Sequence, residues 1–214
     1  MQLSISVLNK NQEEVLSKLS FLANDEYYLA GGTALAIQLG HRTSFDFDFY
    51  TPNYFDQNEL FDKFLEIFAD EAIKTSLAKN TLFCTLRTVD CSFFTYPYNL
   101  LRKPVLERGI ALASLEDIAA MKLLAVNRRP AKRDYVDVYY LLEKFSLGEM
   151  IDFAKEKFPN FNFYCLLRAL SYFEDIKDDE RRHIQMTDKN FSWEGAKDKL
   201  SKEADKYQLS MFNK

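Results

Sequence analysis

The segment from residue 45 to 50, FDFDFY, limits the fold more than any other part of the sequence. Its phenylalanines alternate with Asp46 and Asp48, so the rings face one way and the carboxylates the other, as in a half-buried β-strand. Aspartate has a low strand propensity, so two aspartates in one short strand need a physical reason. The two carboxylates project from one face, about 7 Å apart, and repel each other unless a cation lies between them.

The cation best suited to this pair is Mg²⁺, a hard ion that prefers oxygen ligands and usually shares its coordination with substrate phosphates. The alternative is a strand with one solvated face, on which the aspartates have no further role. A third acid, Asp90, lies in a later expected strand. It either completes a two-metal site, takes a proton from an attacking hydroxyl, or is an ordinary polar residue of a strand.

Hydrophobic periodicity predicts both strands and helices in the first half of the chain. Strands are expected over 27–30, 45–50, 81–87 and 89–95, the last two as separate strands or as one long or bent strand, and helices over 9–22, 33–39 and 56–69. The helix at 33–39 is expected to use Thr33 as its N-cap.

The second half is expected to be helical. Helices are predicted over 114–127 and 132–145, with weaker helical segments at 149–157, 161–175 and 193–207. The first of them opens with a capping box of Ser114 and Asp117. Strands followed by helices predict an α+β fold: a small mixed sheet flanked by helices over residues 1–110, then a helical C-terminal part over 111–214, packed on that core.

Composition excludes several classes of protein. The chain has 214 residues and a net charge of −4, so it is not a generally basic nucleic-acid binder, although a local basic patch is allowed. Three cysteines without a CxxC motif and only two histidines argue against a disulfide framework and against a zinc site. We see no signal peptide and no apolar run of about 18 residues, so we expect a cytoplasmic protein without membrane association.

A second motif, Gly31-Gly32-Thr33, lies between an expected strand and an expected helix. Glycines let the backbone approach an anion closely, and a helix N-terminus offers N–H groups and a favourable dipole. The alternative is an ordinary tight turn followed by an N-cap. Neither the GxxxxGK[ST] loop nor the GxGxxG fingerprint occurs in the sequence.

The segment 102–133 is basic, with eight lysines and arginines against three acids, in a chain that is acidic overall. Such a segment suits a triphosphate or an RNA backbone, or is a solvated helical surface. Asp134 and Asp137 follow it, at a spacing that puts both on one helix face. They orient Lys122 or Lys132, contact a sugar or base, or complement the helix dipole.

Together these residues resemble a known family. The run LAGGTALAIQLGHRTSFDFDFYTP is similar to the first motif of AbiEii/AbiGii-type nucleotidyltransferases, the toxins of type IV toxin–antitoxin systems, which belong to the DNA polymerase β-like nucleotidyltransferase superfamily. Its Arg42 and Ser44 match an Arg and a Ser of the family pattern. TVDCSFFTYPY resembles the strand with the third acid, and LEDIAAMKLLAVNRRPAKRDYVDVYYLL the Lys-bearing helix and its KxDxxD element. The resemblance spans residues 10 to 205 approximately.

The resemblance implies a transferase that moves a nucleoside monophosphate from an NTP to an acceptor. Its implied catalytic residues are Asp46, Asp48, Asp90, Lys122 and Lys132. The three aspartates would bind two Mg²⁺ ions, with Mn²⁺ as an alternative ion. The two lysines would neutralise charge that develops on the pyrophosphate.

The same resemblance implies a set of nucleotide-binding residues: Gly31, Gly32, Thr33, Arg42, Ser44, Asp134 and Asp137. The glycines, Thr33 and Ser44 would hold the β- and γ-phosphates. Arg42 would either neutralise pyrophosphate charge or pair with an acid.

The implied acceptor is RNA, specifically the tRNA acceptor end, and the implied partner is a separate antitoxin protein. Two alternatives stay open. One is a small-molecule nucleotidyltransferase of the antibiotic-modifying type. The other is a catalytically silent relative that binds a nucleotide or a protein.

Overall fold

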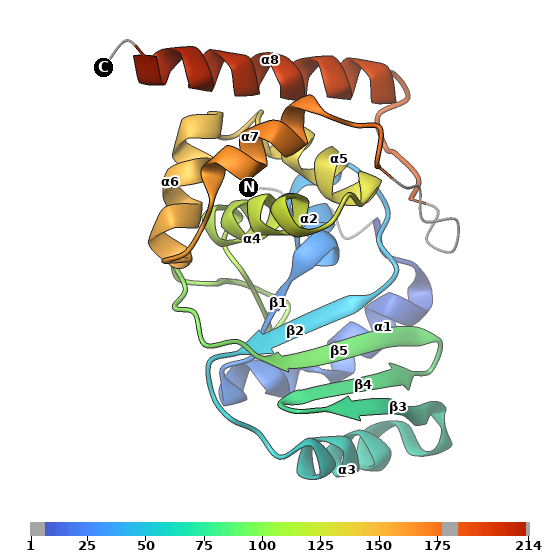
Figure 1. The fold of residues 1–214 in the computed structure, drawn as a ribbon. Helices are drawn as coiled ribbons and strands as arrows, with labels where there is room; N and C mark the ends of the chain where they lie inside the picture. The colour runs from blue at the N-terminus through green and yellow to red at the C-terminus, as the bar shows by residue number, and fades with distance from the viewer. Residues whose placement is uncertain (1–6, 177–183, 213–214) are drawn as a thin grey trace. The chain divides into compact units, whose positions relative to one another are not determined.

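The computed structural model describes residues 7–176 and 184–212. The chain forms two compact units, residues 1–114 and 115–214. The first unit contains the sheet and the second is helical (Figure 1). The α+β class expected from the sequence is confirmed.

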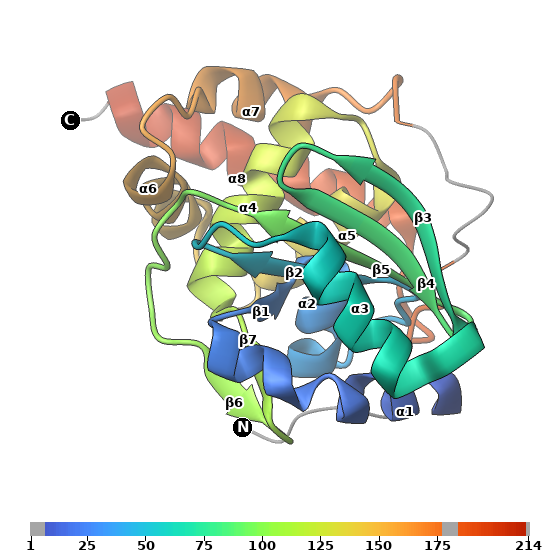
Figure 2. The ribbon, with the colours of Figure 1, turned by 90° about the horizontal axis from the view of Figure 1, so that it is seen from below.

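The first unit is built on a seven-stranded mixed sheet in the order β3-β4-β5-β2-β1-β7-β6. Its strands are β1 (Tyr28–Ala30), β2 (Phe47–Thr51), β3 (Ala72–Ala78), β4 (Thr81–Leu86), β5 (Val89–Thr95), β6 (Val105–Glu107) and β7 (Ile110–Leu112). The pairs β2–β5 and β1–β7 are parallel, and the other four neighbouring pairs are antiparallel. Figure 2 shows the short strands β6 and β7 at the end of the sheet opposite β3.

The helices of the first unit are α1 (Lys10–Lys18), α2 (Gly31–Leu39) and α3 (Gln57–Phe68), with 3₁₀ helices η2 (Ser20–Asp25) and η3 (Ala69–Glu71). Helix α3 begins where the sequence predicts, because the Asp56 carboxylate accepts from the N–H groups of Asn58 and Glu59. The expected N-cap Thr33 is wrong. Helix α2 already begins at Gly31, and the Thr33 side chain is hydrogen-bonded to the chain before β2 instead of to its own helix.

The segments 81–87 and 89–95 are two strands of a hairpin, not one bent strand. β4 and β5 pair antiparallel, and Arg87 takes a positive φ of 56° at the turn. Strand β3 was not expected from the sequence, because its Ile73 faces outward and its segment shows no clear apolar alternation. Strands β6 and β7 have three residues each, too few to form a periodic pattern.

The phenylalanine face of β2 forms the core of the first unit. The rings of Phe49 and Phe93 stack with centroids 5.3 Å apart, and Phe64 of α3 lies 5.0 Å from Phe93. Full burial of one such ring stabilises the fold by about 1.5–3 kcal/mol. Phe45 was expected on this face, but it precedes the strand and is 45% exposed.

The second unit contains α4 (Leu115–Arg128), α5 (Lys132–Leu141), α6 (Leu147–Lys157), α7 (Phe163–Ser171) and α8 (Trp193–Phe212). A buried ion pair joins α6 to α4, with Lys157 Nζ 2.7 Å from Asp117 Oδ1. No helix in the described part of the chain is both long and apolar enough to cross a membrane.

Candidate active site

The three acids singled out by the sequence lie on two neighbouring strands. β2 and β5 are parallel, and their register sets Asp48 beside Ser92. The first pair in this register is Phe47 and Cys91, so the residues just before them, Asp46 and Asp90, also lie side by side. Paired residues on strands about 4.8 Å apart point to the same face, so the three carboxylates share one face of the sheet. Asp46 and Asp48 are partly buried and Asp90 is exposed.

Asp90 is oriented by a residue of the adjoining hairpin strand. Thr85 of β4 lies directly opposite it, and the Thr85 hydroxyl donates to Asp90 Oδ1 at 3.0 Å. This hydrogen bond holds one oxygen of the Asp90 carboxylate in place. The other oxygen, Oδ2, remains as a further hydrogen-bond acceptor of this side chain.

The aspartates supply the donor chemistry that a hard cation needs. Across residues 7–176 and 184–212, no group of three or more His, Cys, Asp or Glu side chains lies close enough together to hold a metal ion by itself. Mg²⁺ is usually held by one or two carboxylates together with water and substrate phosphates, rather than by protein groups alone. The oxygen pair of Asp46 and Asp48 therefore fits Mg²⁺ that binds together with a nucleotide.

Gly31 brings the start of α2 against this carboxylate pair. It adopts a φ of +69°, and a Cβ atom built there would lie 3.0 Å from Asp48 Oδ2. Only glycine combines this left-handed backbone with so close an approach. The N-terminus of α2, where a helix has N–H groups without partners inside the helix, thus lies beside the acids.

Gly32 leaves room for a buried arginine. A Cβ atom on Gly32 would overlap Arg42 Nη2 and lie 3.5 Å from Ser44 Oγ. Arg42 is only 2% exposed, and its Nη1 donates to the Thr43 carbonyl at 2.8 Å. The structure therefore brings Gly32, Arg42 and Ser44 together.

Thr33 and Ser44 fasten α2 to the chain that enters β2. Thr33 Oγ1 is hydrogen-bonded to Ser44 Oγ at 2.7 Å and to the main-chain carbonyl of Asp46. Gln12 of α1 donates from Nε2 to the Ser44 carbonyl at 2.7 Å. These buried hydrogen bonds hold the backbone that presents Asp46.

Cys91 lies behind the acids on the core side of β5. Burial raises the pKa of its thiol well above the usual value, and Cys84 and the nearby carboxylates of Asp90, Asp48 and Asp46 raise it further. The thiol stays protonated at neutral pH, so Cys91 is a small core residue and not a nucleophile, as the sequence suggests.

The second unit brings Lys122, Asp134 and Asp137 together. Lys122 Nζ lies 2.8 Å from Asp134 Oδ1 and 2.6 Å from Asp137 Oδ2, and Arg129 Nε lies 2.9 Å from Asp134 Oδ2. Burial alone would raise the pKa of Asp134, but Lys122 and Arg129 outweigh it and hold the pKa below its ordinary value. The two aspartates thus form ion pairs with Lys122, one of the two lysines considered in the sequence.

Lys132 is placed differently. Its Nζ lies over the ring of Trp193, 5.6 Å from the ring centroid, which is a cation–π distance. Sequence patterns suggest no role for Trp193 beyond the core, because no local pattern links it to a lysine 61 positions earlier.

Sequence reasoning also missed three supporting residues: Gln12, Thr85 and Ser92. Of these, Ser92 had a usable signal, since it lies two positions after Asp90 and so shares its strand face. Gln12 and Thr85 are brought to the site by packing and by hairpin register, which a single sequence does not display.

A mixed sheet with paired carboxylates on one strand and a Gly-Gly helix start beside them defines a nucleotidyltransferase of the α+β type. The comparisons agree. Residues 15–208 match the family described as nucleotidyl transferase AbiEii toxin, type IV TA system. The chain belongs to this AbiEii family, and it is a transferase.

Known proteins resemble it in sequence and in structure. The uncharacterized protein aq_aa25 of Aquifex aeolicus (strain VF5) is 36% identical over 185 residues, which cover 83% of this chain and 89% of that protein. MenT4, the nucleotidyltransferase toxin Rv2826c of Mycobacterium tuberculosis H37Rv, has a similar fold, with a TM-score of 0.57, 14% identity and coverage of 90% of this chain and 81% of that one. The antibiotic-resistance factor ANT(2'')-Ia gives a TM-score of 0.53 at 13% identity, covering 69% and 91%.

Proposed function

We propose that this protein transfers a nucleoside monophosphate from an NTP to RNA, at the tRNA acceptor end, in a Mg²⁺-dependent reaction. The observation that carries the proposal is the shared sheet face of Asp46, Asp48 and Asp90 beside the Gly31 backbone. Membership of the AbiEii family supports a toxin role in the cytoplasm, with a separate antitoxin as partner.

Asp46, Asp48 and Asp90 would hold the metal ions. Two bound Mg²⁺ ions would supply positive charge for the α-phosphate and the leaving pyrophosphate, and Mn²⁺ has the same preference for oxygen ligands. Asp90 would lie next to the attacking hydroxyl of the acceptor. Because Thr85 occupies Oδ1, Asp90 Oδ2 is the oxygen that assists removal of the hydroxyl proton.

The start of α2 would bind the β- and γ-phosphates. The N–H groups of Gly31, Gly32 and Thr33 lie at a helix N-terminus, where anions are favoured. The Ser44 hydroxyl, which is hydrogen-bonded to Thr33 Oγ1, would support this backbone segment at the start of α2. Arg42 is buried behind Gly32, so its positive charge acts on the phosphates from beneath this turn.

Lys122 and Lys132 would neutralise charge on the departing pyrophosphate, as in the family motif that they match. Asp134 and Asp137, which form ion pairs with Lys122, would orient it for this purpose. Most of the rate enhancement in this mechanism comes from positioning and from fixed charges.

The Asp46→Asn variant should lose label transfer almost completely while it stays folded, because it removes one metal-binding carboxylate and keeps the side-chain volume. The assay incubates the protein with Mg²⁺, each α-labelled NTP in turn and total bacterial RNA. Asp62→Asn is the matched control: it makes the same change in charge at an exposed position on α3, and it should retain full activity. Full transfer by Asp46→Asn would contradict the assignment.

A small-molecule acceptor is the second candidate, and the fold shared with the antibiotic-resistance factor favours it. It predicts no label on any RNA, although Mg²⁺–NTP still raises the melting temperature. A third reading, a catalytically silent relative, predicts neither label transfer nor stabilisation by Mg²⁺–NTP.

A further inference from the structure

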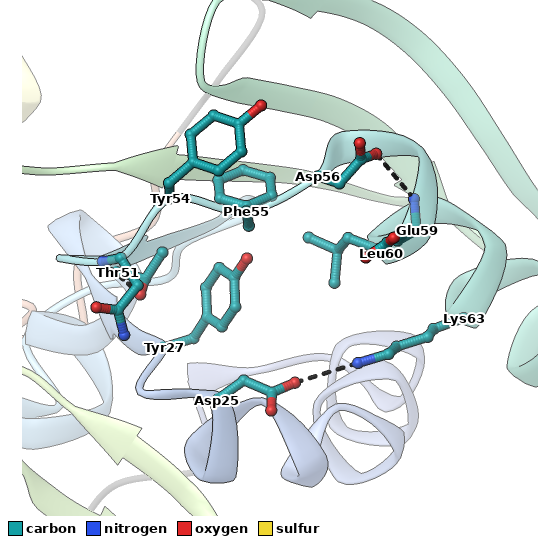
Figure 3. A pocket seen from close by; sticks show the side chains of 10 residues that line it. Asp25, Tyr27, Thr51, Tyr54, Phe55, Asp56, Glu59, Leu60 and Lys63 are labelled. Carbon is teal, nitrogen blue, oxygen red and sulfur yellow. Dashed lines mark hydrogen bonds and ion pairs between the residues drawn. The ribbon is translucent and has the colours of Figure 1, made fainter.

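A hollow in the first unit lies away from the acids. It has a volume of about 430 Å³ and lies between the end of η2, the segment after β2 and the start of α3 (Figure 3). Tyr27 and Thr51 line it, at one end of the β1–β2 pair. Asp48 pairs with Ala30 at the other end of the same pair, so the hollow is separate from the proposed catalytic site.

A buried phenol points into this hollow. Tyr27 is 5% exposed, and its hydroxyl has no hydrogen-bond partner among the described residues. Figure 3 shows the hydroxyl directed toward the space beside Phe55 and Leu60. Buried hydroxyl groups are nearly always hydrogen-bonded, and an unpaired one carries a desolvation cost, so this hydroxyl indicates a missing ligand atom.

The charge of the lining is negative. The lining contains three acids, Asp25, Asp56 and Glu59, and one lysine, Lys63. Lys63 Nζ is 3.3 Å from Asp25 Oδ2 and lies over the Phe21 ring at 5.8 Å, so it already has neighbours on one side of the hollow. The ligand that this lining attracts is a cation.

An anion at the start of α3 is disfavoured as well. Helix N-termini attract anions through their free N–H groups. Here the Asp56 carboxylate already accepts from the N–H groups of Asn58 and Glu59, at 2.7 and 3.2 Å. A phosphate or carboxylate ligand would meet the charges of Asp56 and Glu59 instead of open donors.

The walls between the charged groups are apolar and aromatic. Tyr27 and Phe55 meet edge to face at 5.7 Å, Leu60 lies beside them, and Tyr54 is 76% exposed at the rim. Methylene groups pack against such rings, and ammonium groups are attracted to their faces. Figure 3 shows Asp25 and Asp56 on opposite sides of Tyr27, so acidic groups lie at both ends of the aromatic wall.

We propose that this hollow is a binding site for a small aliphatic diamine. The methylene chain lies along Tyr27, Phe55 and Leu60. One ammonium group contacts Asp25 and the other contacts Asp56 and Glu59. The Tyr27 hydroxyl accepts a hydrogen bond from an ammonium N–H. Burial and the neighbouring Asp25 both raise the pKa of Tyr27, so the phenol stays protonated at neutral pH and accepts through an oxygen lone pair.

The test uses three probes of one chain length: 1,5-diaminopentane, 1,5-pentanediol and glutarate. Calorimetric titration of the full chain, without NTP or RNA, should show saturable binding of the diamine alone. Tyr27→Phe should weaken this binding about tenfold, because it removes a hydrogen bond to a charged group. Glu59→Gln should weaken it about threefold. Glu66→Gln, an equal charge change on the exposed side of α3, should leave it unchanged.

Three results would overturn the proposal: binding of the diol as tight as that of the diamine, binding of glutarate, or equal diamine affinity in Tyr27→Phe, Glu59→Gln and the parent. Binding of a lysine-rich peptide without binding of the diamine would also overturn it, in favour of a protein partner. The Asp46→Asn variant should bind the diamine normally, so the result is independent of the transferase chemistry.

Discussion

At the scale of single residues, two positions in the first unit adopt an arrangement that costs free energy in the absence of a ligand. Gly31 combines a positive φ with close contact to a carboxylate, and Tyr27 buries a hydroxyl without a partner among the described residues. The first feature costs conformational freedom and the second costs desolvation. Both costs are expected where a protein binds ligands.

Gly31→Ala should lower both stability and activity. The new Cβ would meet Asp48 Oδ2 at 3.0 Å, and alanine at a φ of +69° adds about 1–2 kcal/mol of backbone strain. Urea unfolding should show a loss of this size, with transfer activity reduced at least tenfold. Gly148→Ala, where the Cβ would be 3.5 Å from Tyr207, is the control and should be neutral or slightly stabilising. Equal activity in both variants would argue against a role for the Gly31 turn.

Tyr27→Phe should stabilise the ligand-free protein by about 1 kcal/mol, because it removes a buried hydroxyl that has no partner. The change in free energy of unfolding can be measured with urea. Tyr54→Phe, at the exposed rim, should have almost no effect. A loss of stability in Tyr27→Phe would mean that the hydroxyl is satisfied within the protein.

At the scale of elements, α4 and α5 are joined by a buried charge cluster. Lys122 of α4 and Arg129 bring two positive charges to Asp134 and Asp137 of α5. The charges balance within the second unit, so the cluster fixes the two helices against each other. Removing one member leaves a buried charge without its counter-ion.

Asp134→Asn should destabilise the protein by about 3–5 kcal/mol at pH 7, because Asp134 is fully buried. In the parent the folded pKa of Asp134 lies below its ordinary value of 3.8. Its contribution is therefore fully present above about pH 4 and is lost as the pH falls through the lower folded value. Urea unfolding at pH 7, 5, 4 and 3 should show this acid loss in the parent and a flatter curve in the variant. Parallel curves would mean that Asp134 does not couple to stability.

At the scale of the whole molecule, the acidic chain carries its excess of positive charge in one segment. The net charge is −4, yet residues 102–133 contain eight basic residues against three acids. Arg102, Lys103, Arg108 and Arg128 are exposed, whereas Lys122 is buried in its ion pairs. The segment can therefore meet phosphates on its surface, while the rest of the chain repels them.

Binding of tRNA should consequently weaken with salt. If four phosphates are contacted, affinity should fall roughly 50-fold between 50 and 200 mM salt, since the slope is about −0.7 per contact for single strands. Fluorescence anisotropy with labelled tRNA measures it. Lys103→Gln should reduce the slope by about 0.7, and Lys79→Gln, an exposed lysine outside the segment, should not. A slope near zero would favour a small-molecule acceptor.

Local patterns in the sequence predicted many parts of the fold. The alternation of β2, the Asp56 cap of α3 and the helices of the second half all follow from contacts within a few residues. Errors arose where packing overrode local preference. Thr33 is an acceptable N-cap by residue type, but its hydroxyl is engaged by Ser44 and the Asp46 carbonyl.

Local sequence patterns are enough to place Asp46 and Asp48 on one strand face, to put two glycines where α2 begins and to make the second half helical, because side-chain periodicity and backbone freedom are local properties. Three other features appear only in the folded protein: β2 lies beside β5, Asp134 and Asp137 pair with Lys122, and Tyr27 meets Phe55 in a hollow. These neighbours are 12 to 44 positions apart in the chain. Their pairing depends on burying the apolar faces of all elements at once, which no single stretch of sequence specifies.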